Sequence, residues 1–131
     1  MTEFFLSMKP PTVTAQEHKV STRSVKPVFY QDAELKDAKA KFIAHLSKHR
    51  PEQMYTGTVR LTVKWLFPIT GKHFDGEYKT TKPDTDNLQK LFKDCMTKVG
   101  FWKDDAQVAS EIIEKFYSAV TGVYVKVESI C

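Results

Sequence analysis

The sequence of 131 residues has little cysteine and no long hydrophobic run. Its two cysteines, Cys95 within a predicted helix and Cys131 at the chain end, favour neither a disulfide framework nor a thiolate metal site. No stretch approaches the roughly 20 consecutive apolar residues of a membrane-spanning helix, and residues 1–8 are too short and too acidic for a signal peptide. We therefore expect a cytoplasmic protein with free thiols and no membrane contact.

Motifs of several common enzyme classes are also missing. The five glycines form no phosphate-cradling loop, and no serine or cysteine lies in a recognisable nucleophile setting. The four histidines have no spacing suited to zinc, although His45 and His49 share one predicted helix face. Nucleotide-driven and covalent mechanisms therefore have no support in the sequence, and the acidic residues remain as candidates.

Length and charge indicate one basic domain over residues 1–131. A formal net charge of +4 and an apolar fraction of 41% fit a globular protein with a polyanionic partner, a combination that many other proteins share. The layout is more informative, because acidic residues are bunched while many lysines and arginines lie in flanking loops. The bunched residues are Asp84, Asp86, Asp104 and Asp105. We expect an acidic pocket within a basic surface.

Periodicity and breakers predict the first elements. Residues 3–8 indicate a short strand, and residues 9–27 an aperiodic loop with Lys19, Arg23 and Lys26 as candidate DNA contacts. Asp32 is the predicted cap of an amphipathic helix that ends before Pro51. Strict alternation predicts a half-buried strand over 59–67, followed by a polar loop. That loop carries the further candidate DNA contacts Lys72, Lys79 and Lys82.

The second half of the chain continues the alternation of strands and helices. An apolar stripe from 88 to 99 predicts a helix that stops at Gly100. Residues 108–117 and 123–127 look like two strands joined across Thr121-Gly122. This order predicts a fold of the α/β class, with the mixed strand directions of α+β folds. We expect one compact domain in which a mixed sheet packs against two main helices.

Side chains next to these elements have two interpretations each. Trp65 and Trp102 fit either core packing or stacking on exposed bases. Core packing is favoured for Trp65, which is in register with other strand core positions, whereas Trp102 lies beside the acidic turn and fits both. Lys115 and Tyr117 fit a DNA-facing strand or a solvated edge equally well.

Asp84 and Asp86 lie where a loop meets the start of a predicted helix. N-capping alone explains either aspartate, since free N–H groups and the helix dipole favour carboxylates there. Two such aspartates followed by a later acidic pair indicate a cation-binding site as well as a cap, because the mutual repulsion of the carboxylates must be offset by a cation. Oxygen ligands of this kind suit magnesium, which also binds phosphate oxygens, and phosphodiester cleavage follows naturally. Lys90 then contacts phosphate or forms an i,i+4 ion pair.

Two motifs carry a resemblance to a known family. The segments Lys82-Pro83-Asp84-Thr85-Asp86-Asn87-Leu88, with Lys90, and Phe101-Trp102-Lys103-Asp104-Asp105 resemble the signature of RusA-type Holliday-junction resolvases. The resemblance covers about the C-terminal third of the chain and implies a RusA-like fold. It also implies a homodimeric, magnesium-dependent endonuclease that nicks four-way junctions symmetrically, with manganese as a substitute metal.

On the matching positions, the resemblance implies that Asp84, Asp86 and Asp105 hold the metal and that Lys90 assists at the phosphate. Asn87 and Asp104 would have supporting roles. The alternative is a non-catalytic module that binds branched DNA and uses its carboxylates for a structural metal. A role in recombination, repair or the processing of branched phage or prophage DNA is equally compatible with the sequence.

Overall fold

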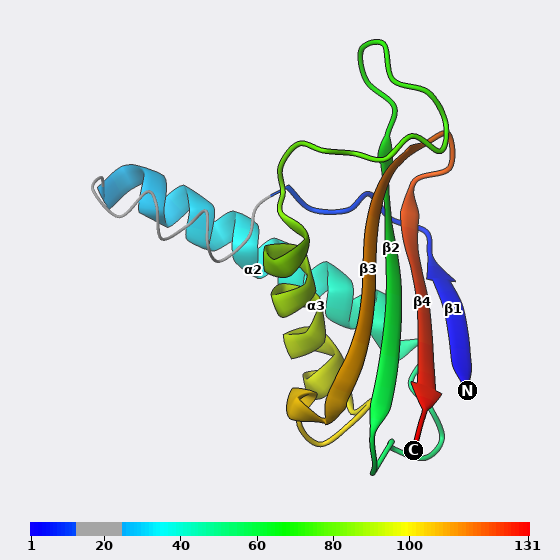
Figure 1. Cartoon of the computed structure of the whole chain (residues 1–131). Coiled ribbons are helices and arrows are strands. Elements are labelled where there is room, and N and C mark those ends of the chain that lie inside the picture. Colours follow the sequence, from blue (N-terminus) through cyan, green and yellow to red (C-terminus); the bar gives the residue numbers. More distant parts are fainter. Residues whose placement is uncertain (13–24) are drawn as a thin grey trace.

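A four-stranded sheet carries both α-helices on one of its faces (Figure 1). The computed structural model describes residues 1–12 and 25–131, and of these it describes 25–32 by their backbone alone. Within these residues the expected mixed sheet packed against two main helices is confirmed. The elements are β1 (Thr2–Leu6), α2 (Val25–Ser47), β2 (Val59–Pro68), α3 (Thr85–Val99), the 3-10 helix η1 (Asp105–Gln107), β3 (Val108–Ser118) and β4 (Gly122–Ser129).

The strand order is β1-β4-β2-β3. Strand β4 runs antiparallel to both of its neighbours, whereas β2 and β3 run parallel. Parallel neighbours cannot be joined by a tight turn and need a crossover connection, which α3 supplies here. The crossover brings α3 against β3, at the edge of the sheet.

The alternation of β2 produces the core. Its residues Val59, Leu61, Val63, Trp65 and Phe67 are all buried and face the helices. The Trp65 ring receives Phe42 of α2 and Phe92 of α3 edge-on, with ring centroids 5.8 and 5.1 Å away. Edge-to-face packing of this kind adds stabilisation beyond the buried area. The predicted half-buried strand and the core position of Trp65 are confirmed.

Helix α3 follows the predicted stripe and ends as expected. Its buried side carries Leu88, Leu91, Phe92, Cys95 and Met96. Gly100 adopts a left-handed conformation at φ 104°, and its N–H donates to the carbonyls of Met96 and Thr97. Glycine is favoured there because a side chain would clash in that backbone region.

The start of α2 was predicted wrongly. The helix begins at Val25, so Asp32 lies inside it and residues 25–27 are not part of a loop. Pro27 did not prevent this, because the first four N–H groups of a helix have no partner within it. The remainder of the expected loop, residues 13–24, lies outside the described residues.

The connection at Thr121-Gly122 does not form a hairpin. Strand β2 lies between β3 and β4, so these consecutive strands are not neighbours in the sheet. Gly122 has no positive φ; a Cβ atom there would instead lie 2.5 Å from the carbonyl oxygen of Leu6 in β1. The glycine therefore permits a close approach of strands and does not make a turn.

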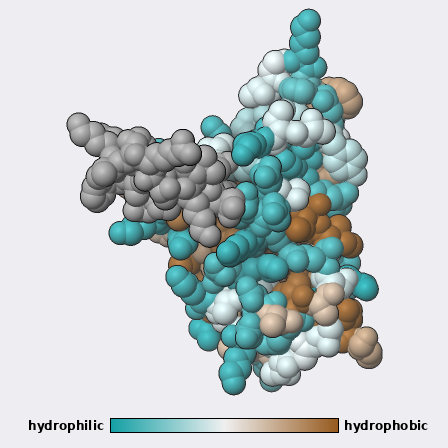
Figure 2. Space-filling view, turned by 60° about the vertical axis from the view of Figure 1, so that its left-hand side comes forward, coloured by the Kyte–Doolittle hydropathy of each residue, from teal (hydrophilic) through white to brown (hydrophobic). Residues whose placement is uncertain are grey.

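Figure 2 shows hydrophilic side chains over most of the helix side of the molecule, with hydrophobic atoms confined to smaller patches. Within the described ranges, the helices are too short or too polar to cross a membrane.

Candidate active site

The N-terminus of α3 holds two aspartates that do not cap the helix with their side chains. Asp84 occupies the N-cap position with φ −72° and ψ 148°, yet its carboxylate makes no capping hydrogen bond. Asp86 lies in the first turn and is exposed. Side-chain capping, the simpler interpretation of Asp84, is therefore wrong. Both carboxylates remain near the positive end of the helix dipole.

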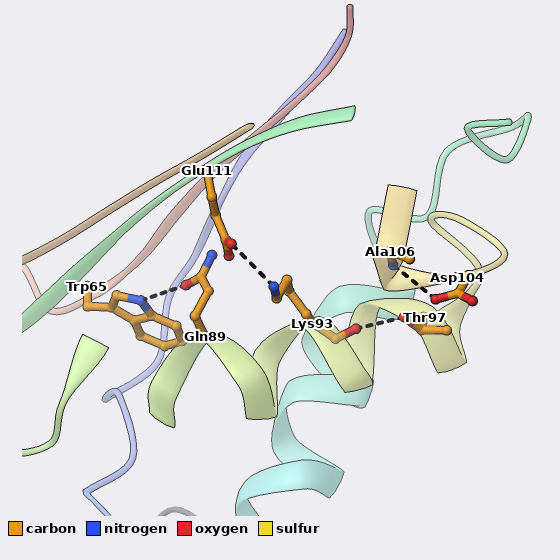
Figure 3. A network of polar contacts seen from close by, with 7 residues as sticks. All are labelled: Trp65, Gln89, Lys93, Thr97, Asp104, Ala106 and Glu111. Atoms are coloured by element: carbon orange, nitrogen blue, oxygen red, sulfur yellow. Dashed lines mark hydrogen bonds and ion pairs between the residues drawn. The ribbon is translucent and has the colours of Figure 1, made fainter. Parts of the chain in front are cut away.

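The second acidic pair lies at the start of η1, with Asp104 as its N-cap and Asp105 as its first residue. Asp104 caps the turn by accepting a hydrogen bond from Ala106 N at 2.9 Å (Figure 3). Gln107 completes a capping box, and its Nε2 donates to the Tyr55 carbonyl at 2.9 Å, which ties the turn to the segment before β2. Asp104 thus holds the turn, while the half-buried Asp105 is positioned by it.

An open pocket runs between α3 and β3. Its lining consists of Asp86, Gln89, Lys90, Lys93, Asp105, Glu111 and Ile113. The structure therefore brings Asp105 of η1 together with Asp86 and Lys90, which lie one turn apart on α3. Asp84 does not line this pocket.

Asp84 lies instead at the end of a loop that Lys115 fastens to β3. Lys115 Nζ donates to the carbonyl oxygens of Thr81 at 2.6 Å and Pro83 at 2.7 Å. Partial burial lowers the pKa of Lys115, Lys79 lowers it further, and the charge of Asp84 acts in the opposite direction. Lys115 thus points toward the helix layer, so its interpretation as part of a solvated edge is wrong, and its interpretation as a DNA-facing residue stays a prediction.

The two lysines that line the pocket are engaged differently. Among the ion pairs between described residues none involves Lys90, so the expected i,i+4 pair is not found. Lys93 pairs with Glu111 of β3, with Nζ 3.2 Å from Oε1. Lys90 is exposed at the pocket and remains available to an anionic ligand.

The donors of the pocket suit an open magnesium site. Magnesium takes one or two carboxylates, several waters and substrate phosphate oxygens, and Asp86 and Asp105 supply two carboxylates in one pocket. Within the described part of the chain, however, no three acidic, histidine or cysteine side chains form a ready-made cage. The arrangement fits a metal completed by water and substrate better than a closed structural site.

The predicted DNA-contact residues fall in different settings. Lys19 and Arg23 lie outside the described residues. Lys26 lies in the first part of α2, where the structure describes the backbone alone. Lys72 and Lys82 are exposed in the loop between β2 and α3.

Lys79 in the same loop is half-buried, and its contacts are with other residues of the protein. Its Nζ lies 5.2 and 5.0 Å from the ring centroids of Phe67 and Tyr117, and it donates to Thr81 Oγ1 at 2.6 Å. These contacts hold the loop against the sheet and leave Lys72 and Lys82 as the freer cations.

Trp102 is core, because it is fully buried and its Nε1 donates to Thr97 Oγ1 at 2.7 Å. Stacking of Trp102 on bases is therefore excluded in this conformation. Asn87 is half-buried in the first turn of α3, and its side chain has no hydrogen bond to another described residue. The role predicted for Asn87 stays a prediction.

Sequence reasoning missed three polar residues of the pocket, namely Gln89, Lys93 and Glu111. Helical spacing from Asp86 would have found Gln89 and Lys93, since residues three, four and seven positions apart share a helix face. The β3 residue Glu111 carried no such signal, because its position depends on the register with β2.

Comparison with known proteins shows the family of this chain. A family model described as "Endodeoxyribonuclease RusA" matches residues 9–128. The chain belongs to the RusA family. Both RusA-like motifs, at the start of α3 and at η1, lie within the matched residues.

Curated relatives of this RusA protein match it over parts of their length. It is 36% identical over 67 residues to "Crossover junction endodeoxyribonuclease rusA" of Lactococcus phage r1t, covering 50% of this chain and 51% of the relative. It is 35% identical over 95 residues to "Uncharacterized protein YqaN" of Bacillus subtilis, covering 64% and 66%. It is 56% identical over 32 residues to "Crossover junction endodeoxyribonuclease RusA" of Escherichia coli K12, covering 24% and 27%. Each match thus spans less than two thirds of the relative.

Proposed function

We propose that this protein is a magnesium-dependent endonuclease that cuts branched DNA, four-way junctions above all. The observation that carries the proposal is the single pocket lined by Asp86, Asp105 and Lys90. The family description as an endodeoxyribonuclease and the names of two relatives as crossover junction endodeoxyribonucleases support the choice of reaction and substrate.

Each residue of the pocket has a distinct task in this proposal. Asp86 and Asp105 would hold the cation, and Asp84 would add a third carboxylate from the start of α3. A magnesium ion in such a site lowers the pKa of a bound water and stabilises charge on the leaving oxygen. Lys90 donates to a phosphate oxygen of the scissile strand and so positions it. Manganese is expected to substitute, because it accepts the same oxygen ligands.

Two copies of the chain would match the symmetry of the substrate. A four-way junction offers two equivalent strands, and a twofold-symmetric homodimer presents two equivalent sites. We therefore propose a homodimer that makes paired symmetric nicks. A junction in a supercoiled plasmid tests this proposal: paired nicks during one binding event give linear DNA, whereas independent nicks give open circles first.

The principal rival is a non-catalytic module that binds branched DNA and keeps its carboxylates for a structural metal. Purified full-length protein incubated with synthetic four-way junctions, linear duplexes and magnesium or manganese separates the two. The nuclease proposal predicts metal-dependent cuts in the junction and little cutting of the duplex. Junction binding without cleavage under all metals and junction sequences would support the rival.

A substitution of Asp86 tests whether this pocket is the active site. Asp86→Asn should abolish cleavage while leaving or improving junction binding, because it removes negative charge from a site that faces phosphate. Asp37→Asn is the matched control, since Asp37 is an exposed helical aspartate that pairs with Lys41 on α2. Unchanged cleavage by Asp86→Asn would remove Asp86 from the mechanism.

A further inference from the structure

The register of β3 directs one acidic side chain toward the helices. In the parallel pair, Leu61 lies opposite Glu111 and Val63 lies opposite Ile113. Paired residues of neighbouring strands project from the same face of a sheet, and Leu61 and Val63 are fully buried under the helices. Glu111 therefore projects toward α3 and lines the same pocket as Asp86 and Asp105.

In this structure the carboxylate of Glu111 forms an ion pair with a lysine. Lys93 Nζ lies 3.2 Å from Glu111 Oε1, and the two side chains are only 21% and 25% exposed. Partly desolvated charges of this kind require a partner. The Lys93 ammonium supplies a positive charge to Glu111.

Beneath this pair lies a buried amide with an unused donor. Gln89 is 2% exposed, and its Oε1 accepts a hydrogen bond from Trp65 Nε1 at 3.3 Å. Among the described residues its Nε2 has no partner. Figure 3 shows this nitrogen pointing from α3 toward the side of the pocket where Glu111 lies. Leaving a buried donor without an acceptor is unfavourable, so an oxygen arriving beside it would be favoured.

We infer that Glu111 is a further carboxylate of the cation site, held by Lys93 until the cation binds. The inference rests on the proposed function and extends its metal site. With a cation bound beside Asp86 and Asp105, Glu111 would turn from Lys93 toward the cation, and Gln89 Nε2 would donate a hydrogen bond that orients its carboxylate. Carboxylates that bind metals are commonly held by such hydrogen bonds from neighbouring groups.

The same movement would free Lys93 for DNA. Once separated from Glu111, its ammonium lies in the pocket beside Lys90 and can donate to a phosphate oxygen. Each phosphate that a lysine neutralises releases counterions. The cation and the DNA would thus favour the same rearrangement of the pocket.

Titration of the DNA-free protein with Mn²⁺ tests the inference, with unbound Mn²⁺ measured by electron paramagnetic resonance. Glu111→Gln should weaken binding on the order of tenfold or more, the usual effect of losing a group that holds a metal or its ligands. Glu114→Gln should bind as the wild type does. Glu114 lies on the same strand but alternates to the other face, where it accepts a hydrogen bond from the Tyr78 hydroxyl.

Two more variants make the outcomes distinguishable. Lys93→Met should bind Mn²⁺ more tightly than the wild type, because the cation no longer competes with an ammonium; thermal melting of each variant confirms that it is folded. Wild-type affinity in Glu111→Gln with weakened binding in Asp86→Asn would overturn the inference and leave the proposed function standing. Wild-type affinity in both variants would overturn the inference and the proposed metal site together.

Discussion

Two neighbouring strands present paired rows of side chains to the same helices and use them differently. The row on β2 consists of Leu61, Val63, Trp65 and Phe67, all buried in the core. The row on β3, opposite it residue by residue, consists of Glu111, Ile113, Lys115 and Tyr117. Because β3 is the edge of the sheet, α3 covers its row only in part, so charged groups there keep some contact with water.

Helix α3 is also divided into a buried apolar side and a polar side that faces the pocket. Its buried side joins the core through Leu91 and Phe92, whereas Asp86, Lys90 and Lys93 line the pocket on the side of β3. Gln89 lies at the boundary and joins the two regions through its hydrogen bond with Trp65. The comparison teaches that the buried β2 row serves mainly stability, whereas the partly exposed β3 row contributes charged groups beside the candidate site.

The largest effect on stability is expected at the centre of the β2 row. Trp65→Ala should lower the free energy of unfolding by about 3–5 kcal/mol, because it leaves a cavity between Phe42 and Phe92 and removes the donor to Gln89. Urea denaturation followed by circular dichroism measures the change. A loss below about 1 kcal/mol would show that the division between the rows is wrong.

An intermediate effect is expected at Lys115, the β3 residue opposite Trp65. Lys115→Met should lower the free energy of unfolding by only about 1 kcal/mol, since it removes hydrogen bonds at a partly exposed site. It should slow junction cleavage strongly, because the loop that carries Asp84 loses its attachment.

Lys126→Met is the control for Lys115→Met, since Lys126 forms an ion pair with Glu128 on β4, away from the pocket. Urea melts and junction cleavage rates should both stay near those of the wild type in this control. Equal slowing of cleavage by the two variants would mean that the loop attachment has no specific role.

A small effect on stability is expected when the ion pair of the β3 row is replaced by apolar residues. Lys93→Met combined with Glu111→Leu should change the free energy of unfolding by less than about 1 kcal/mol, because ion pairs with access to water contribute little. Mn²⁺ affinity should fall in the same protein. A destabilisation as large as that of Trp65→Ala would place this pair in the core, contrary to the comparison.

The last test needs no substitution and compares the alkylation of the two cysteines. Burial raises the pKa of Cys95, on the core side of α3, to about 11. Only the thiolate is nucleophilic, so Cys95 should resist alkylation at pH 8 while the exposed Cys131 reacts. Mass spectrometry of the folded protein measures both sites. Comparable rates would show that the core side of α3 opens readily.

Properties confined to one element were predicted well from the sequence. The period of two in β2 and the helical stripe of α3 follow from backbone geometry, which acts between near neighbours in the chain. Gly100 was predicted as the end of α3 for a similar local reason. The start of α2 was missed because the local signals at Asp32 and Pro27 permitted more than one helix boundary.

The sequence by itself determined the acidic motifs, the family resemblance and the residues of each helix face and strand face. Only the tertiary structure decided that β2 separates β3 from β4 and that Glu111 and Lys115 project toward α3. It also decided that Asp104 caps a turn while Asp105 shares a pocket with Asp86. The physical reason is that strand register and helix placement depend on burying the whole core at once, which no local spacing encodes.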